Sequence, residues 1–251
     1  MIRVQEAEGL RVIELDRPEK LNALTLGMVE GLRDLLRDAS DDAAVRGVIL
    51  AGAGRSFCAG VDLAEFAEGT PESAQLLITA LAEACDAALR CPKPVAAAIH
   101  GHCLGGALEL ACACDFRVAA EGARLGMPEV AVGIPSVIHA ALIQRHIGLG
   151  RAQELLLTGD LIDAERAYAW GLVNRVVRAG RRVESAAELL GRVNRHDPAA
   201  IARQKRLHVE WQELGLAEAV DRSRADLVES FASGVPQRIS RRRLEERLRK
   251  L

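Results

Sequence analysis

The composition of this chain predicts a globular protein with a sizeable core and no strong overall charge. Of its 251 residues, 49% are hydrophobic, 27% are charged and only 3% are aromatic, and the formal net charge is −2. This balance excludes a global attraction to nucleic acid, and the lack of a run of about 18 apolar residues predicts no membrane span.

The six cysteines lie in or beside apolar segments and lack the spacing of zinc ligands. We interpret them as reduced core residues. Met1 is followed by a polar, strand-like stretch rather than an apolar signal core. Together these features predict a cytoplasmic location, because disulfides are rare in that compartment.

Strand and helix patterns alternate as far as about residue 180, which favours an α/β architecture. Strands are predicted at 2–5, 10–15, 45–51, 95–99, 116–119 and 174–177. Helices are predicted at 25–40, 73–90, 107–114, 137–147, 152–157 and 163–171. Beyond Arg181 four further helices are predicted, at 184–195, 198–211, 216–231 and 236–250. We therefore expect an α/β core with the active site at 1–195 and a helical C-terminal region at 196–251.

The stretch 91–120 concentrates the unusual residues of the chain. Two prolines precede a short apolar strand, and a Gly-Gly pair then opens an apolar helix. Within that helix Glu109 is the one carboxylate, and a buried carboxylate rarely lacks a partner or a purpose. The glycine pair leaves free N–H groups at the helix N-terminus, where negative charge is favoured. These features predict a site that stabilises an oxyanion and moves protons.

A second carboxylate, Glu129, follows Met127 and Pro128 in a loop with little other charge. Two carboxylates in different surroundings can divide the work of acid and base. The alternative is that one forms a buried salt bridge and the other is an ordinary loop residue.

Other motifs in the sequence give weaker evidence of function. The sequence GAGRSF at 52–57 imitates a dinucleotide-binding loop but has Phe57 where the third glycine would stand. His100, His102 and Cys103 lack further ligands for zinc, so we predict no metal site there. We interpret the two histidines as a hydrogen-bonded pair on one face of a strand end. A nucleophilic role for Cys103 is the alternative.

Several segments resemble the crotonase superfamily, most closely enoyl-CoA hydratases. They are RPEKLNAL at 17–24, SFCAGVDL at 56–63, PKPVAAAIHGHCLGGALELACACDFRVA at 92–119, MPEVAVGIPS at 127–136 and LLLTGDLIDAERAYAWGLVNRVV at 155–177. They occur in the family's order over most of residues 10–180. The C-terminal helices match in general character and in FASGVPQ at 231–237.

The resemblance implies a spiral of β-β-α turns and a helical C-terminal region that assembles trimers, often paired into hexamers. It also implies an acyl-CoA thioester as substrate, with no cofactor beyond that coenzyme A. The family's oxyanion hole would be the N–H groups of Val61 and Gly106. Its two catalytic glutamates would be Glu109, which orients and activates a water, and Glu129, which handles the proton at C2. Residues lining the coenzyme A arm would be Lys20, Leu21, Ala23, Ala59, Val61, Asp62 and Leu63.

The presence of both glutamates favours hydration, since isomerase relatives usually keep only the second. Other enolate reactions on this scaffold stay open, namely double-bond isomerisation, C–C bond hydrolysis and thioester hydrolysis. The segment GIPSVIHAAL at 133–142 lacks the glycine-rich run of well-studied hydratases, so the acyl preference is open too. A mild departure is Ala107 in the third position of the glycine turn. A non-catalytic RNA-binding or scaffold role rests only on the arginine-rich stretch 239–250, which is more typical of a solvated or subunit-contacting helix.

Overall fold

The computed structural model describes residues 1–249, and within them the chain divides into two compact units. They are Met1–His196 and Asp197–Leu251. The predicted end of the last helix, Lys250, lies outside the described residues.

Across residues 1–249, the larger sheet has six strands, which are parallel except for the hairpin at one edge. In spatial order these are β1 (Ile2–Ala7), β2 (Leu10–Leu15), β3 (Gly47–Gly52), β4 (Val95–Ile99), β6 (Phe116–Ala120) and β9 (Arg175–Val177). The two central strands are buried along their whole length. Continuous apolar runs are typical of parallel strands, because helices cover both faces of such sheets.

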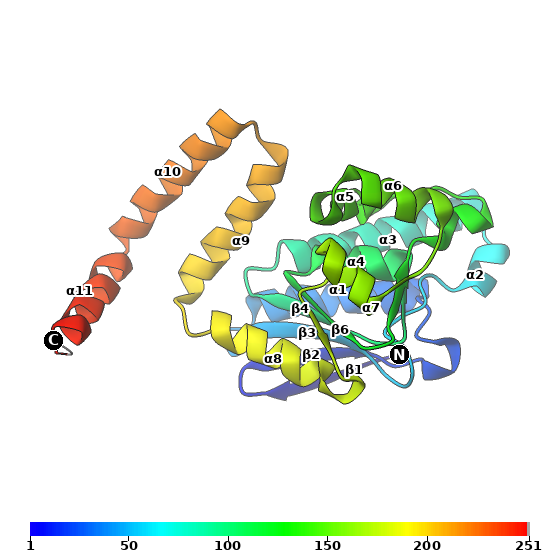
Figure 1. Cartoon of the computed structure of the whole chain (residues 1–251), viewed down its shortest axis with the longest axis horizontal. Coiled ribbons are helices and arrows are strands. Elements are labelled where there is room, and N and C mark those ends of the chain that lie inside the picture. Colours follow the sequence, from blue (N-terminus) through cyan, green and yellow to red (C-terminus); the bar gives the residue numbers. More distant parts are fainter. Residues whose placement is uncertain (250–251) are drawn as a thin grey trace. The chain divides into compact units, whose positions relative to one another are not determined.

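Strand alternation decides which helix covers which face. Val48 and Leu50 of β3 belong to the main core. Ile49 and Ala51 point the other way, into a smaller core with Leu190. Figure 1 shows α8 on that second face, with α1 and α3 on the first. The helices of this unit are α1 (Leu26–Asp41), α2 (Leu63–Ala67), α3 (Pro71–Leu89), α4 (Gly106–Ala113), α5 (Ala141–Ile147), α6 (Leu149–Thr158), α7 (Ala164–Trp170) and α8 (Arg182–Val193).

A second, smaller sheet positions the site. Within the described chain it holds β5 (His102–Leu104), β7 (Arg124–Gly126) and β8 (Ile162–Asp163). Two single-residue bridges extend it, because Cys58 pairs in parallel with Cys103 and Leu24 pairs in parallel with Val61. Successive chain segments thus leave the large sheet, add to the small one and then enter a helix, as β4, β5 and α4 do in turn.

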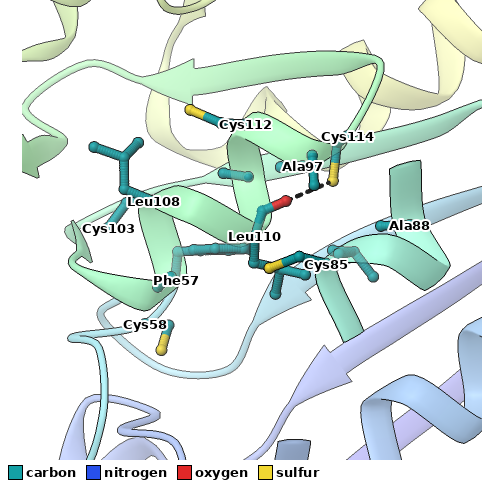
Figure 2. Packing of buried hydrophobic residues seen from close by; sticks show 14 of the residues in the cluster. Phe57, Cys58, Cys85, Ala88, Ala97, Cys103, Leu108, Leu110, Cys112 and Cys114 are labelled. Atoms are coloured by element: carbon teal, nitrogen blue, oxygen red, sulfur yellow. Dashed lines mark hydrogen bonds between the residues drawn. The ribbon is translucent and has the colours of Figure 1, made fainter. Parts of the chain in front are cut away.

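The core around α4 is built from small side chains. Every residue of this helix is buried, and Cys112 and Cys114 pack there with alanines and leucines (Figure 2). The Cys114 thiol bonds the carbonyl oxygen of Leu110 at 3.4 Å. All six cysteines of the sequence lie in the described residues and are free and buried, which confirms the prediction that they are reduced core residues.

Several short elements were absent from the sequence-based prediction, among them β5, β8 and α2. The three-residue strand β5 is too short to show an alternating pattern, and it was predicted as part of a turn. The five-residue helix α2 falls in a stretch that was not assigned. The helix predicted at 137–147 is also interrupted, since Ile138–Ala140 forms a 3₁₀ turn before α5 begins.

The second unit consists of α9 (Pro198–Glu213), α10 (Leu216–Ala232) and α11 (Val235–Leu248). Ion pairs between α9 and α10 join Arg206 to Asp226 and Arg222 to Glu210. The division of the chain into a core that holds the active site, at 1–195, and a helical C-terminal region from 196 onward stays a prediction. Among the described residues, no helix combines the length and apolar character needed to cross a membrane.

Candidate active site

Two loops bring two backbone N–H groups to one place. The segment after β3 runs parallel to β5, with Cys58 opposite Cys103, and hydrogen bonds of 2.9 and 3.2 Å hold the two segments together. Three residues beyond that pair lie Val61 on one segment and Gly106 on the other. Because the two segments run parallel from the paired cysteines, their register brings the two predicted oxyanion donors to the same level of the small sheet.

Both N–H groups are free to bind a ligand. Within residues 1–249 no acceptor is found for the N–H of Val61 or for that of Gly106, the first residue of α4. Gly60 has φ +96° and lies so close to β5 that a Cβ there would stand 2.9 Å from the carbonyl oxygen of Leu104. Only glycine tolerates both the conformation and the close approach.

An apolar cavity of about 370 Å³ opens beside these groups. Its walls come from the loop 59–63, from α2 and α3, from the start of α4 and from the segment 128–137. Of the lining residues in the described chain, Glu109 and Glu129 alone carry polar side chains. The structure thus brings together both predicted glutamates, both predicted donors and the predicted Ala59 and Leu63.

The Glu109 carboxyl is poorly suited to being charged. The residue is 3% exposed, and burial together with the nearby charge of Glu129 raises its pKa to about 8, although a hydrogen bond from the Ala140 N–H opposes the shift. Glu129 is half-buried, and burial raises its pKa as well, opposed by hydrogen bonds from its own N–H and from Ser136. Burial therefore favours the neutral form of both carboxyl groups, most strongly that of Glu109.

Glu129 is held by close contacts on two sides. The Ser136 hydroxyl donates to Glu129 Oε2 at 3.2 Å. On the other side a Cβ on Gly105, which has φ +55°, would stand 2.5 Å from Glu129 Oε1. The glycine preceding the oxyanion donor therefore also makes room for the second carboxylate.

The residues predicted to line the coenzyme A arm fall into two groups. Leu21 accepts a hydrogen bond from the Ala59 N–H at 3.0 Å, so the segment 20–23 lies beside the loop 59–63 as expected. Lys20, Leu21, Ala23 and Asp62 do not line the cavity. The carboxylate of Asp62 pairs with Arg17 and caps α2, and these contacts lower its pKa.

The prediction for the histidines was wrong in its geometry. His100 follows β4 of the larger sheet and His102 begins β5 of the smaller one, with Gly101 at φ +55° between them, so they do not share one strand. His100 Nε2 lies 2.9 Å from Gly54 O, and His102 Nδ1 lies 3.2 Å from Ser56 Oγ. Both therefore brace the glycine-rich loop after β3. Cys103 is fully buried and burial raises the pKa of its thiol well above the usual range, which disfavours a nucleophilic role.

The sequence did not reveal the role of Asn22, whose side chain shapes the glycine-rich loop after β3. Asn22, with φ +58°, is fully buried and donates to the carbonyl oxygens of Ala53, Ser56 and Phe57 at 2.9, 2.8 and 3.2 Å. Its one available signal was an asparagine in a loop, since asparagine tolerates this conformation better than most residues.

The described residues contain no group of three or more His, Cys, Asp or Glu side chains arranged to hold a metal ion.

The fold and the site combine an apolar cavity with two backbone N–H groups that lack an acceptor among the described residues and with two carboxylates. A model of the family described as enoyl-CoA hydratase/isomerase matches residues 5–248. The chain therefore belongs to this family, and the predicted membership of the crotonase superfamily and its fold are confirmed.

Named relatives agree with this assignment. A crotonyl-CoA hydratase from Syntrophomonas wolfei is 34% identical over 238 residues, which are 92% of this chain and 88% of that protein. A mevalonyl-coenzyme A hydratase from Aspergillus fumigatus is 34% identical over 248 residues, 96% of this chain and 92% of the relative. Among solved structures, an enoyl-CoA hydratase from Bacillus anthracis has a TM-score of 0.85 and 35% identity, covering 89% of this chain and 88% of that one.

Proposed function

We propose that this protein is an enoyl-CoA hydratase, which adds water across the C2–C3 double bond of a 2-enoyl-CoA thioester to give a 3-hydroxyacyl-CoA. One observation carries the proposal. Two carboxylates, of which burial favours the neutral form, lie in the same apolar cavity as two backbone N–H groups that have no acceptor among the described residues. Relatives named as hydratases of crotonyl-CoA and of short-chain enoyl-CoA support it.

The geometry supports a simple course of reaction. The thioester carbonyl oxygen accepts hydrogen bonds from the N–H groups of Val61 and Gly106, which stabilise the enolate that forms when oxygen adds at C3. One carboxylate of the pair takes a proton from the water, and the other supplies a proton to C2. A pair that holds one proton has one member ready for each task. Burial raises the pKa of Glu109 to about 8, so we propose Glu109 as the protonated member and Glu129 as the base, which exchanges the roles expected from the sequence.

The cavity lining indicates the class of acyl group. Apart from the two glutamates, the described lining residues carry no side-chain donor or acceptor for a substituent on the acyl tail. A buried hydroxyl or carboxylate without a partner loses about 1–3 kcal/mol or more. We therefore propose an unsubstituted aliphatic 2-enoyl group, carried by coenzyme A, with no other cofactor taking part.

The test uses the absorbance of the conjugated enoyl thioester, which is lost on hydration. We expect the protein to hydrate aliphatic 2-enoyl-CoA thioesters with kcat/KM at least about 10-fold above matched thioesters that end in a hydroxyl or carboxylate group. The Glu109→Gln, Glu129→Gln double variant is the control for background hydration. Thioester hydrolysis without loss of the double bond would instead assign another reaction of the family.

We also propose that the chain forms trimers, or hexamers made of two trimers, through its C-terminal helices. Large apolar side chains on α10 are exposed in the single chain, with Leu216 at 84%, Val228 at 73% and Phe231 at 51%. A monomer would leave this surface in water, whereas symmetric assembly buries it. Arginines 241–243 of α11 lie on the same unit, and a surface role or a contact with a neighbour's coenzyme A is open to them.

Light scattering at micromolar concentration should therefore give about three or six times the mass of one chain. The Val228→Glu, Phe231→Glu double variant should dissociate, while Arg224→Glu, a charge change at an exposed position of the same helix, should not. A monomeric parent protein would contradict the assembly.

We place the protein in the cytoplasm because its buried, free cysteines suit a reducing compartment.

A further inference from the structure

One short segment contacts both glutamates although it carries neither of them. Glu109 lies on α4, and Glu129 lies in the 3₁₀ turn Pro128–Val132. The segment 136–140 reaches Glu129 Oε2 through the Ser136 hydroxyl at 3.2 Å. It reaches Glu109 through the Ala140 N–H, a donor that also bonds Val137 O at 3.0 Å. The geometry of the acid–base pair thus depends on how this segment is held.

The segment is strained, and a contact with α3 helps to hold it. Ile138 has φ +44°, a conformation that is unfavourable by about 1–2 kcal/mol and rare for a β-branched residue. Strain of this kind persists only where surrounding contacts impose it. Ile138 packs against the main core, and a polar contact beside it joins His139 Nε2 to Asp86 Oδ1 of α3 at 3.3 Å. Because a carboxylate only accepts, Nε2 donates in this pair.

Two thiols near Glu109 have no charge to contribute, and the carboxylate of Asp86 is paired with other groups. Cys85 of α3 and Cys112 of α4 face it, but burial raises the pKa of both thiols, to about 11 for Cys112, so they are neutral. Asp86 points to His139 and also lies 3.8 Å from Arg90. The protonation of the pair is therefore governed by the two glutamates and by the donors that the segment supplies.

We propose that Ser136 and His139 are positioning residues of the hydratase. Ser136 holds the Glu129 carboxylate, and His139, braced on Asp86, holds the Ala140 N–H against Glu109. The proposal rests on the proposed function, because it assigns these residues to the acid–base pair of that reaction. It also explains how a segment that lacks the glycine-rich run of well-studied hydratases can support both carboxylates.

The two contacts should affect opposite limbs of the pH profile. A hydrogen bond to a carboxylate stabilises its charged form, so removing it raises the pKa of that carboxyl group. In the proposed reaction Glu129 is ionised and Glu109 is protonated. The value of kcat/KM therefore falls at pH values below the pKa of Glu129 and at pH values above the pKa of Glu109. We expect Ser136→Ala to move the acidic limb up by roughly 0.5–1 pH unit, and His139→Ala to move the alkaline limb up by a similar amount.

Matched variants separate positioning from general damage. In Ser136→Thr the hydroxyl is kept, and in His139→Gln a donor to Asp86 is kept, so both should stay near the parent profile. Ser136→Ala should lose about 10-fold in kcat with KM within about twofold, because the thioester contacts are unchanged. If His139→Ala does not fold, Asp86→Asn weakens the same contact from α3 and should move the same limb.

A second readout does not need activity. Carbon-13 NMR of the labelled glutamate carboxyl groups, without substrate, should show a higher pKa for Glu129 in Ser136→Ala and for Glu109 in His139→Ala. Lower activity at every pH with unchanged limbs and unchanged carboxyl titrations would overturn the proposal. A parent protein that hydrates no enoyl thioester, while the titrations move as described, would sink the proposed function and leave the positioning roles standing.

Discussion

Glu109→Gln and Glu129→Gln should each lower the turnover of enoyl thioester hydration by about 10²-fold or more. Glutamine keeps the volume and a hydrogen-bonding side chain but cannot exchange a proton, so KM should change little. Because both residues act on one water, the double variant should lose much less than the product of the single losses. Steady-state kcat and KM for the two single variants and the double variant measure this directly.

Near-normal turnover in Glu109→Gln would remove the hydratase assignment. It would favour double-bond isomerisation, which needs only Glu129 of the two glutamates. A loss confined to KM would instead mean that the glutamates shape the cavity without handling protons.

The same substitution provides a control on folding, because Glu109 is costly to ionise. Its folded-state pKa, about 8, lies above the ordinary value of 4.5. The neutral group therefore favours the folded protein, and its contribution is lost as the pH rises from 4.5 through about 8. Glutamine stays neutral, so Glu109→Gln should be more stable than the parent at pH 9 by several kcal/mol, each pH unit corresponding to about 1.4 kcal/mol.

Urea unfolding of both proteins at pH 4.5 and at pH 9 measures this difference, which should nearly vanish at the lower pH. Equal stabilities at both values would show that folding does not raise the pKa of the Glu109 carboxyl, and that this group is well solvated in the folded protein.

Gly106→Pro should lower turnover by about 10²–10³-fold relative to Gly106→Ala, through loss of one oxyanion donor. Gly106 is the first residue of α4, where proline is accepted because its missing N–H has no partner in the helix. Gly105, with φ 55° and ψ −129°, is in a mirror-image extended conformation that glycine can keep before a proline. Thioester binding should weaken far less, since most contacts lie along the coenzyme A arm.

The alanine variant is the matched control. A Cβ on Gly106 would stand 2.5 Å from Leu81 Cδ2, so both substitutions force this buried side chain to move. Sequence alone predicts only a modest loss of stability for the proline variant and does not foresee Leu81. Comparing the two variants, also in a Leu81→Ala background, cancels the steric effect and leaves the N–H as the difference. Equal turnover in the two would mean that Gly106 is a packing glycine and that the oxyanion interpretation is wrong.

The sequence alone predicted the parts of the site that depend on local pattern. Prolines and glycines bounded β4 and the start of α4, and Glu109 stood out because every neighbour on its helix is apolar. Short apolar runs predicted buried strands, since a strand covered on both faces has no polar side. The resemblance to the crotonase superfamily then gave residue-level hypotheses for Val61, Gly106 and Glu129.

Only the tertiary structure decided how distant segments meet. The pairing of Cys58 with Cys103 brings together the two N–H groups that we propose as oxyanion donors, and a three-residue strand leaves no periodic signal to reveal it. Likewise nothing in the sequence near Ser136 or His139 connects them to Glu129 or Asp86. Periodicity reports which face of an element is buried, whereas the contact between two carboxylates and their donors depends on strand register and on a turn at Ile138 that local preferences oppose.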